Sequence, residues 1–353
     1  MPHRFLVKEI ARQAGVAPAT VDRVLHGRAH VREHTRNRVE QAIRDLERQE
    51  TLLAMTGRKL RVDVVVEAPS RFAVEIRAAL EAELPGLRPA VFLPRFDMRE
   101  TMSTVQVVEA LDAIGARGSH GVLLKARDVP EVVEAIARLR AKGVPVLTLF
   151  TDIPDSQRIA YAGLDNRVAG ATAAYLVGQW VGRRPGSVLL TRSDERFHGE
   201  EQRAQGFRGV LQQRSPRLRL VDASGGHGLD VPTGQRVRDA LAGVDDVVAV
   251  YSMGGGNLAI LRALSTLGVR PRCFIGHDLD RENTQLLRAG RIHAVLHHEL
   301  RQDLRSACQQ LMCFHGLLPA ASVGPCSQVV VVTPENVPQA GWGRPLEPAR
   351  PRG

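Results

Sequence analysis

Residues 7–27 read V-K-E-I-A-R-Q-A-G-V-A-P-A-T-V-D-R-V-L-H-G. The first part predicts a helix, because one face collects the apolar or small residues Val7, Ile10, Ala11 and Ala14. Gly15 then predicts a turn, and a second short helix follows with an inner face of Val21, Val24 and Leu25. Two short helices joined by a tight turn form a helix-turn-helix, whose second helix enters the major groove of DNA.

A third helix is predicted over residues 35–46, with an inner face of Val39, Ala42, Ile43 and Leu46. Charge also supports a contact with DNA. Residues 1–61 hold 13 Lys and Arg against 7 Asp and Glu, so +6 of the net charge of +10 lies in this segment. A basic terminal segment ahead of a nearly neutral body is typical of a DNA-contacting module. The alternative is a generally arginine-rich proteome, and arginine does far outnumber lysine here.

The rest of the composition disfavours several classes of protein. The chain has no apolar run long enough for a transmembrane helix and no basic-then-apolar N-terminal signal. We therefore expect a cytoplasmic, nucleoid-associated protein without a membrane partner. No metal site or other cofactor is predicted, since no zinc-binding spacing is found among the cysteines, which are Cys273, Cys308, Cys313 and Cys326.

Beyond residue 60 the chain alternates short β-branched runs with amphipathic helices. Strands are predicted at 61–66, 121–125, 144–150, 186–191, 246–251, 272–277, 292–297 and 328–332. Helical patterns lie between them at 131–142, 168–181, 202–213 and 258–267. This alternation predicts βαβ units with more strands than one sheet holds comfortably. We expect two doubly wound parallel sheets with a cleft between them, where ligands bind at the carboxyl ends of strands.

Residues 6–46 resemble the headpiece of the LacI/GalR family of transcriptional regulators. The resemblance rests on the run I-A-R-Q-A-G-V-A-P-A-T-V-D-R-V-L-H-G and on the third-helix run V-R-E-H-T-R-N-R-V-E-Q-A-I-R-D-L. It implies that the second helix reads bases with Pro18, Ala19 and Arg23. Arg23 could bind guanine bidentately, which discriminates between bases by roughly 1–3 kcal/mol. Thr20 and Thr35 would hold phosphates, which fixes register without reading sequence.

Other parts of the headpiece depart from that family. Asp22 stands where many members have a small hydroxyl residue, and we favour a salt bridge to a neighbouring arginine over a base contact. The family's linker places an apolar side chain in the minor groove. Met55 is nearest that position here, although Leu52 and Leu53 are alternatives and packing against the body is equally compatible with the sequence.

Residues 61–337 resemble the ribose-binding type of periplasmic binding protein domain. The motifs are V-P-V-L-T-L-F-T-D, Y-A-G-L-D-N-R-V-A-G, E-Q-R-A-Q-G-F and F-I-G-H-D-L-D. The resemblance implies a headpiece at 1–47, a linker at 48–60 and a two-lobed effector domain at 61–338. The glycine- and proline-rich composition predicts a disordered tail at 339–353. Lobe 1 would comprise 61–162 and 297–322, and lobe 2 would comprise 163–296 and 323–338.

A polyol site needs fixed carboxylates and amides, because every hydroxyl both donates and accepts hydrogen bonds. The resemblance assigns ligand contacts to Asp278 and to His298, which stands where relatives carry a glutamine. Asp152 could reach the cleft or cap the next turn, and Asn257 could bind ligand or belong to a tight turn. For Asp165 and Asn166 we favour helix capping.

The run E-Q-R-A-Q-G-F departs from the family at Glu201, where many relatives have a ligand-clamping arginine. Arg203 remains, and Arg196 or His198 could replace the missing clamp. A carboxylate at Glu201 argues against an anionic effector and for a neutral sugar or polyol.

These expectations combine into a transcriptional repressor that acts as a homodimer on a palindromic operator of double-stranded DNA and is controlled by a small sugar or polyol. One alternative is a sugar-binding protein of a transport system without DNA function. Another is an enzyme on a doubly wound fold, which the lack of a nucleophile-base pair disfavours.

Overall fold

The computed structural model describes residues 5–28, 31–54, 58–325 and 327–338. Met55, Cys326 and the predicted tail at 339–353 lie outside these residues. The chain folds as two compact units, a helical N-terminal unit and an α/β body. No helix in the described ranges is both long and apolar enough to cross a membrane.

The N-terminal unit contains α1 (Val7–Ala14), α2 (Pro18–Leu25) and α3 (Glu33–Ala54). Its fully or nearly fully buried core is formed by Ile10, Ala11, Ala14, Val21, Val39 and Ala42. Val7, Val24, Leu25, Ile43 and Leu46 pack against that core, so the predicted inner faces are confirmed. Gly15 has a φ of 61°, the left-handed conformation that glycine adopts without strain, and it ends α1 there.

Helix α3 is longer than the predicted 35–46. It continues to Ala54, through most of the segment assigned to the linker. The added stretch E-R-Q-E-T-L-L-A consists mostly of good helix formers, and the first glycine after it is Gly57. The helix therefore continues even though this stretch lacks a clear apolar period.

The first sheet of the body has the strand order β2-β1-β3-β4-β5. Its strands are β1 (Arg58–Glu67), β2 (Ala90–Arg99), β3 (Gly121–Lys125), β4 (Val146–Leu149) and β5 (Ala160–Ala162). The pairs β1–β3, β3–β4 and β4–β5 are parallel. The helices between these strands are α4 (Ser70–Glu83), α5 (Thr104–Arg117) and α6 (Pro130–Ala141). We call this sheet and its helices the first lobe.

The second sheet has the order β11-β10-β9-β8-β6-β7, parallel except for the antiparallel pair β10–β11. Its strands are β6 (Gly186–Thr191), β7 (Leu218–Asp222), β8 (Val247–Ser252), β9 (Cys273–His277), β10 (Ala294–His297) and β11 (Val330–Val332). Its helices are α7 (Asn166–Val181), α8 (His198–Arg214), α9 (Asp230–Ala240), α10 (Asn257–Thr266) and α11 (Arg281–Arg288). We call this sheet and these helices the second lobe.

Helices cover both faces of the second sheet. Along β8, Tyr251 belongs to the core shared with α7 and α8, whereas Val250 belongs to the core shared with α9, α10 and α11. Successive side chains of a strand point to opposite faces, so burial on both faces requires a helix layer on each. The predicted doubly wound α/β architecture is confirmed.

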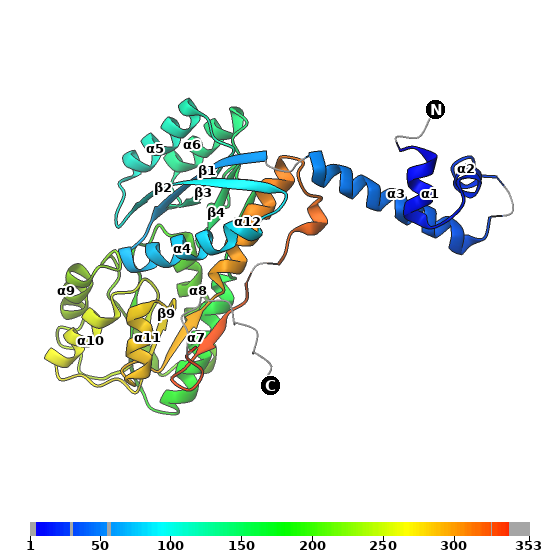
Figure 1. Ribbon diagram of the computed structural model, residues 1–353. Coiled ribbons are helices and arrows are strands. Elements are labelled where there is room, and N and C mark those ends of the chain that lie inside the picture. The colour runs from blue at the N-terminus through cyan, green and yellow to red at the C-terminus, as the bar shows by residue number, and fades with distance from the viewer. Residues whose placement is uncertain (1–4, 29–30, 55–57, 326, 339–353) are drawn as a thin grey trace, which may run out of the picture. The chain divides into compact units, whose positions relative to one another are not determined.

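The chain crosses between the lobes more than once. After β10 of the second lobe, α12 (Leu300–Phe314) packs against α4, β4 and β5 of the first lobe, and Figure 1 draws it next to α4. Arg301 and Arg305 of α12 donate to the two carboxylate oxygens of Glu83 at 2.6 and 2.5 Å. The chain then returns to the second sheet as β11. The crossing segments 163–165, 298–299, 315–325 and 327–329 therefore connect the two lobes.

Candidate functional site: the pocket between the lobes and the helix-turn-helix surface

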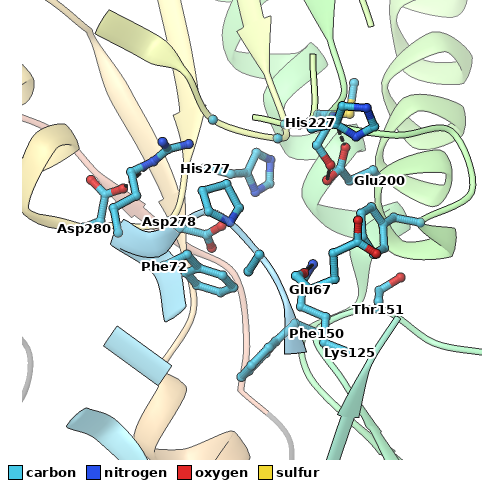
Figure 2. A pocket seen from close by; sticks show the side chains of 18 of the residues that line it. Glu67, Phe72, Lys125, Phe150, Thr151, Glu200, His227, His277, Asp278 and Asp280 are labelled. Carbon is cyan, nitrogen blue, oxygen red and sulfur yellow. Dashed lines mark hydrogen bonds and ion pairs between the residues drawn. The ribbon is translucent and has the colours of Figure 1, made fainter. Parts of the chain in front are cut away.

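A pocket lies between the two sheets of the body, where strands of both end. Glu67 ends β1, Lys125 ends β3, and Phe150 and Thr151 follow β4. Ser193 follows β6, Met253 follows β8 and Asp278 follows β9. The carboxyl ends of parallel strands are the usual place for a ligand in open α/β sheets. Figure 2 shows Glu67, Lys125, Glu200, His277 and Asp278 around one space.

Aromatic rings form the apolar part of the wall. Phe72 of α4 meets Phe150 edge to face, with 5.6 Å between ring centroids. Phe197, which precedes α8, is buried, and the Nζ atom of Lys125 lies 4.0 Å from its ring centroid. These rings supply apolar surface beside the polar groups, as in most small-molecule sites.

Glu67 takes part in an ion-pair chain that joins the lobes. It accepts a hydrogen bond from Arg127, whose Nε lies 3.1 Å from Asp194 Oδ2 in the second lobe. Burial raises the pKa of Glu67 against the opposing charge of Arg127. The other oxygen, Oε2, is buried and has no hydrogen-bond partner within the described residues. That oxygen is free to accept a hydrogen bond from a ligand.

Helix α8 supplies a fixed carboxylate and a fixed cation one turn apart. Glu200 accepts from the backbone N–H and the hydroxyl of Ser193, both at 2.5 Å. Arg203 is buried and donates from Nε to Asn166 Oδ1 at 2.7 Å and from Nη1 to the Met253 carbonyl at 3.1 Å.

Close helix packing explains how Arg203 is placed. A Cβ atom at Gly170 of α7 would lie 1.9 Å from the carbonyl oxygen of Arg203, and one at Gly206 of α8 would lie 2.1 Å from that of Arg167. Only glycine allows this approach of two backbones. The glycine of the run E-Q-R-A-Q-G-F therefore lets α8 lie close enough to α7 for Arg203 to reach the pocket.

Asp278 is the first of four polar side chains that contact one another in sequence from the pocket into the protein interior. Its Oδ1 lies 3.5 Å from His298 Nε2, and His298 Nδ1 lies 2.6 Å from Asp303 Oδ2. Ser327 donates to both oxygens of Asp303, each at 2.8 Å. Burial alone would raise the pKa of Asp278, but the contact with His298 and the charge of Arg203 hold that pKa well below its usual range. Burial likewise opposes the charging of His298, but Asp278 and Asp303 raise its pKa to about 9.

A second link between the lobes closes the opposite side of the pocket. Arg71 of α4 lies with Nε 3.1 Å from Asp280 Oδ2 and donates from Nη2 to the Gly228 carbonyl at 2.8 Å. Asp280 is the N-cap of α11, accepting from the backbone N–H of Asn283 at 2.7 Å. Burial raises the pKa of Asp280 to about 6. One arginine of the first lobe thus binds two segments of the second.

Two histidines complete the polar lining. The Nε2 atom of His277 lies 2.7 Å from the hydroxyl of Tyr251, and burial holds the pKa of His277 well below its ordinary value. His277 is therefore neutral, and its Nδ1 has no hydrogen-bond partner in the described part of the chain. His227 lines the same pocket from a loop of the second lobe.

Two of the predicted ligand residues lie together at the pocket. Asp278 lines it, and His298 contacts Asp278 from behind. Asp165 caps α7 as expected, accepting from the Val168 backbone N–H at 3.0 Å. Asn166, predicted to cap as well, instead binds the pocket residue Arg203.

The structure places the other five predicted ligand residues outside the pocket lining, each bound to a protein group. Asp152 pairs with Arg158, Arg196 with Asp194 and Glu201 with Arg192. His198 lies 3.6 Å from Asp128, and Asn257 donates to Asn283 at 2.6 Å. Glu200, the neighbour of Glu201, supplies the carboxylate in the lining.

Four functional residues were not predicted from the sequence, namely Glu67, Arg127, Lys125 and Glu200. The signal for two of them is visible in the sequence: V-V-V-E and V-L-L-K each end a buried strand with a charged residue. The signal for Glu200 is weaker, because Glu200 and Glu201 are adjacent and only helix phase decides which one faces the pocket.

On the helix-turn-helix, Pro18, Ala19 and Arg23 are exposed, while Thr20 and Thr35 are half-buried. Asp22 pairs with Arg28 at 3.4 Å, as favoured, and also with His26 at 3.1 Å. Neither pairing involves Arg23, the arginine of α2, which is exposed.

Two family models match the chain. Residues 6–47 match the bacterial regulatory proteins of the lacI family, and residues 62–312 match the periplasmic binding protein domain. The HTH-type transcriptional regulator TreR of Salmonella typhimurium is 30% identical over 243 residues, which are 68% of this chain and 62% of that protein. The match thus spans less than two thirds of that regulator's length.

Solved structures show the same fold. GanP, a glucose-galactose binding protein from Geobacillus stearothermophilus, superposes with a TM-score of 0.70 and 20% identity, covering 80% of this chain and 99% of that one. A putative LacI transcriptional regulator from Bacteroides fragilis superposes with a TM-score of 0.67 and 14% identity over 79% and 99% of the two chains. The body of the chain, residues 62–312, therefore belongs to the periplasmic binding protein domain family, and the N-terminal residues 6–47 are similar to the bacterial regulatory proteins of the lacI family.

Proposed function

We propose that the protein is a sequence-specific transcriptional repressor whose affinity for its operator is controlled by a small neutral sugar or polyol. The observation that carries the proposal is the pocket between the lobes, which combines fixed carboxylates, fixed donors and aromatic rings. It occurs in a chain that also carries an exposed helix-turn-helix surface.

The chemistry of the lining fits a ligand rich in hydroxyl groups. Glu67, Glu200 and Asp278 present acceptors, whereas Arg203 and Lys125 present donors. Each ligand hydroxyl can then donate to a carboxylate and accept from a cation. Phe72, Phe150 and Phe197 offer surface to the C–H groups of a sugar ring. The carboxylates of Glu67, Glu200 and Asp278 disfavour an anionic ligand. Glu201, from which a neutral ligand was predicted, lies outside the lining.

For DNA, we propose that Arg23 reads a guanine, that Pro18 and Ala19 make apolar base contacts, and that Thr20 and Thr35 bind phosphates. Met55 stays the proposed minor-groove residue. One headpiece reads one half-site, so we propose a homodimer on a palindromic operator. We further propose that the protein acts on the nucleoid in the cytoplasm and does not catalyse a reaction.

Control follows from the two lobes. A ligand that binds both lobes favours their closed arrangement over an open one, because it gains contacts only when they approach. Linkage then requires that a sugar which weakens operator binding is itself bound more weakly in the presence of operator.

The first experiment is a thermal-shift panel of D-glucose, D-galactose, L-arabinose, D-ribose, inositols and polyols, with sugar phosphates and sugar acids alongside. A sugar at 100 times its dissociation constant should stabilise the protein by about 2.7 kcal/mol. Asp278→Asn should abolish the shift, while Glu201→Gln, outside the lining, should preserve it. A shift with phosphates or acids alone would contradict the neutral-ligand proposal.

DNA reading is tested with a duplex selected from a random library. We expect Arg23→Ala to weaken binding to the selected duplex by roughly 1–3 kcal/mol and to relax specificity at one position. Thr35→Val should instead weaken selected and scrambled duplexes alike. Fluorescence anisotropy with both duplexes measures the difference, and equal losses for both variants on both duplexes would refute base reading by Arg23.

A further inference from the structure

Three buried polar side chains and the half-buried Asp278 connect the pocket to the other lobe. Asp278 follows β9 of the second lobe, whereas Asp303 belongs to α12, which packs on the first lobe. His298 lies between them on a crossing segment, and Ser327 lies on another. His298 is 1% exposed and Asp303 is fully buried. This arrangement places an imidazole between two carboxylates, one from each lobe.

The contacts fix the protons of that imidazole. Ser327 donates its N–H and its hydroxyl to Asp303, so this carboxylate is held as an acceptor. The Nδ1 atom of His298, 2.6 Å from Asp303, must therefore carry a proton. A bare Nε2 would direct a lone pair at Asp278 Oδ1, 3.5 Å away, and repel it. Both nitrogens are therefore protonated, and His298 is an imidazolium.

Two atoms between His298 and Asp278 lack a hydrogen-bond partner among the described residues. Neither His298 Nε2 nor Asp278 Oδ1 has a partner at hydrogen-bond distance in the described ranges, although they lie close enough to attract each other. Asp278 lines the pocket, and the ring of His298 lies 5.3 Å from that of the lining residue Phe150.

We propose that Asp303, which does not line the pocket, is a positioning residue for effector recognition. It holds His298 in the doubly protonated form, and that form keeps Asp278 oriented as a hydrogen-bond acceptor for the ligand. The proposal rests on the function proposed above for the identity of the ligand, but not for the charge of His298.

The surroundings of His298 show why Asp303 is needed. The charged or titratable groups that act on it are Asp278, Asp303, His277 and His297, and Arg203 acts on its partner Asp278. His277 and His297 are neutral, since burial lowers both pKa values, that of His297 to about 3. Without the charge of Asp303, only Asp278 would oppose the burial of the imidazolium. Asp303→Asn should therefore let His298 lose its proton as the pH rises through the neutral range.

The direct test is ¹⁵N NMR of the full-length chain labelled at histidine. His298→Gln identifies the His298 signals among those of the 12 histidines. We expect both ring nitrogens of His298 to be protonated from pH 6 to pH 8 in the wild-type chain and to titrate within that range in Asp303→Asn. Asp63→Asn removes another buried carboxylate, paired with Arg95 and Arg117, and should leave the signals unchanged. A neutral His298 tautomer in the wild-type chain at pH 7 overturns the proposal, even if Asp303→Asn does not fold.

A second test measures affinity against pH for whichever panel monosaccharide most stabilises the wild-type chain. The ratio of the Asp303→Asn affinity to the wild-type affinity should fall from pH 6 to pH 8 by up to about tenfold per pH unit, the limit for one linked proton. Both chains share the titration of Asp280, so the ratio isolates His298. His298→Gln combined with Asp303→Asn should restore the pH dependence of the wild type, because a glutamine amide donates at every pH. The same pH dependence in Asp303→Asn and in the wild type contradicts the proposal. If no sugar binds the wild-type chain, the proposed function fails, and the NMR result alone decides this inference.

Discussion

The pKa values of two carboxyl groups that follow β9, Asp278 and Asp280, are shifted in opposite directions. Asp278 has a lowered pKa despite burial, because it faces His298 and the charge of Arg203. Asp280 has a pKa raised to about 6, because burial outweighs its hydrogen bond from Asn283 and its pairing with Arg71. Asp278 is therefore a carboxylate that accepts hydrogen bonds, whereas Asp280, only two residues further along the chain, is easily protonated.

Asp280 provides a pH prediction. Its folded-state pKa lies above the ordinary value of 3.8, so the folded state binds more protons than the unfolded state between these values. Protonated Asp280 therefore contributes about 3 kcal/mol to the free energy of unfolding. This contribution is fully present below pH 3.8 and is lost as the pH rises through 6. Asp280→Asn keeps a helix-capping side chain but removes this titration.

We expect Asp280→Asn to gain stability relative to the wild type on going from pH 4 to pH 7. Urea unfolding of both proteins at a series of pH values measures that difference. Asp239→Asn, an exposed change on α9, is the matched control and should follow the wild-type profile. Parallel profiles for Asp280→Asn and the wild type would rule out the raised pKa.

At the same scale, strand ends were the part of the site that could be predicted. The resemblance assigned Asp278, which also follows a buried strand, and Glu67 and Lys125 follow buried strands in the same way. Glu201 was chosen because it stands at the position of the family's clamping arginine, whereas the packing of α8 directs its neighbour Glu200 into the lining. The pairing of Asp152 with Arg158 could not be foreseen, since it depends on where the chain turns after β4.

Among the strands, all the central ones were predicted, whereas of the four edge strands only β11, within the predicted 328–332, was predicted. The missed strands β2, β5 and β7 all lie at an edge of their sheet. An edge strand is covered less completely, so its sequence lacks a continuous apolar run, and β2 even contains Pro94. The central strands β3, β4 and β6 are almost wholly buried and read as apolar runs.

The core of the helical unit depends on Ile10. Ile10 is fully buried among α1, α2 and α3, and Ile10→Ala should cost roughly 2–5 kcal/mol. A unit this small has little stability to lose. We expect the variant to lose operator binding while its body still binds sugar, because the body is a separate compact unit.

Operator anisotropy and sugar thermal shift, measured on the same preparation, separate the two effects. Leu6→Ala, an exposed apolar position just before α1, is the matched control and should retain both activities. Loss of sugar binding in Ile10→Ala would show that the two units do not fold independently.

At the scale of the whole molecule, two arginines of the first lobe bind the second. Arg127 joins Glu67 to Asp194, and Arg71 joins α4 to Asp280 and Gly228. These contacts can form only while the lobes are close together. They therefore contribute to the closed arrangement with or without a ligand, and they set how much of the closing free energy the ligand must supply.

Arg71 is the better test of this idea, because Arg127 also donates to the Met102 carbonyl within its own lobe. Arg71→Met keeps an apolar side chain of similar length but removes both links across the pocket. Loss of a partly buried ion pair and its hydrogen bond should cost about 1–3 kcal/mol of closure, which weakens sugar binding by roughly five- to 150-fold, mainly through faster release.

The matched control is Arg77→Met on the same helix, since Arg77 pairs with Glu81 inside α4 and lies over the Phe96 ring of β2, both in the first lobe. Stopped-flow release of a panel sugar, with small-angle scattering of the sugar-free proteins, measures release and opening together. We expect Arg71→Met to release sugar faster and to have a larger radius of gyration, while Arg77→Met matches the wild type. Unchanged release in Arg71→Met would mean that the ligand's own contacts, and not this arginine, hold the lobes together.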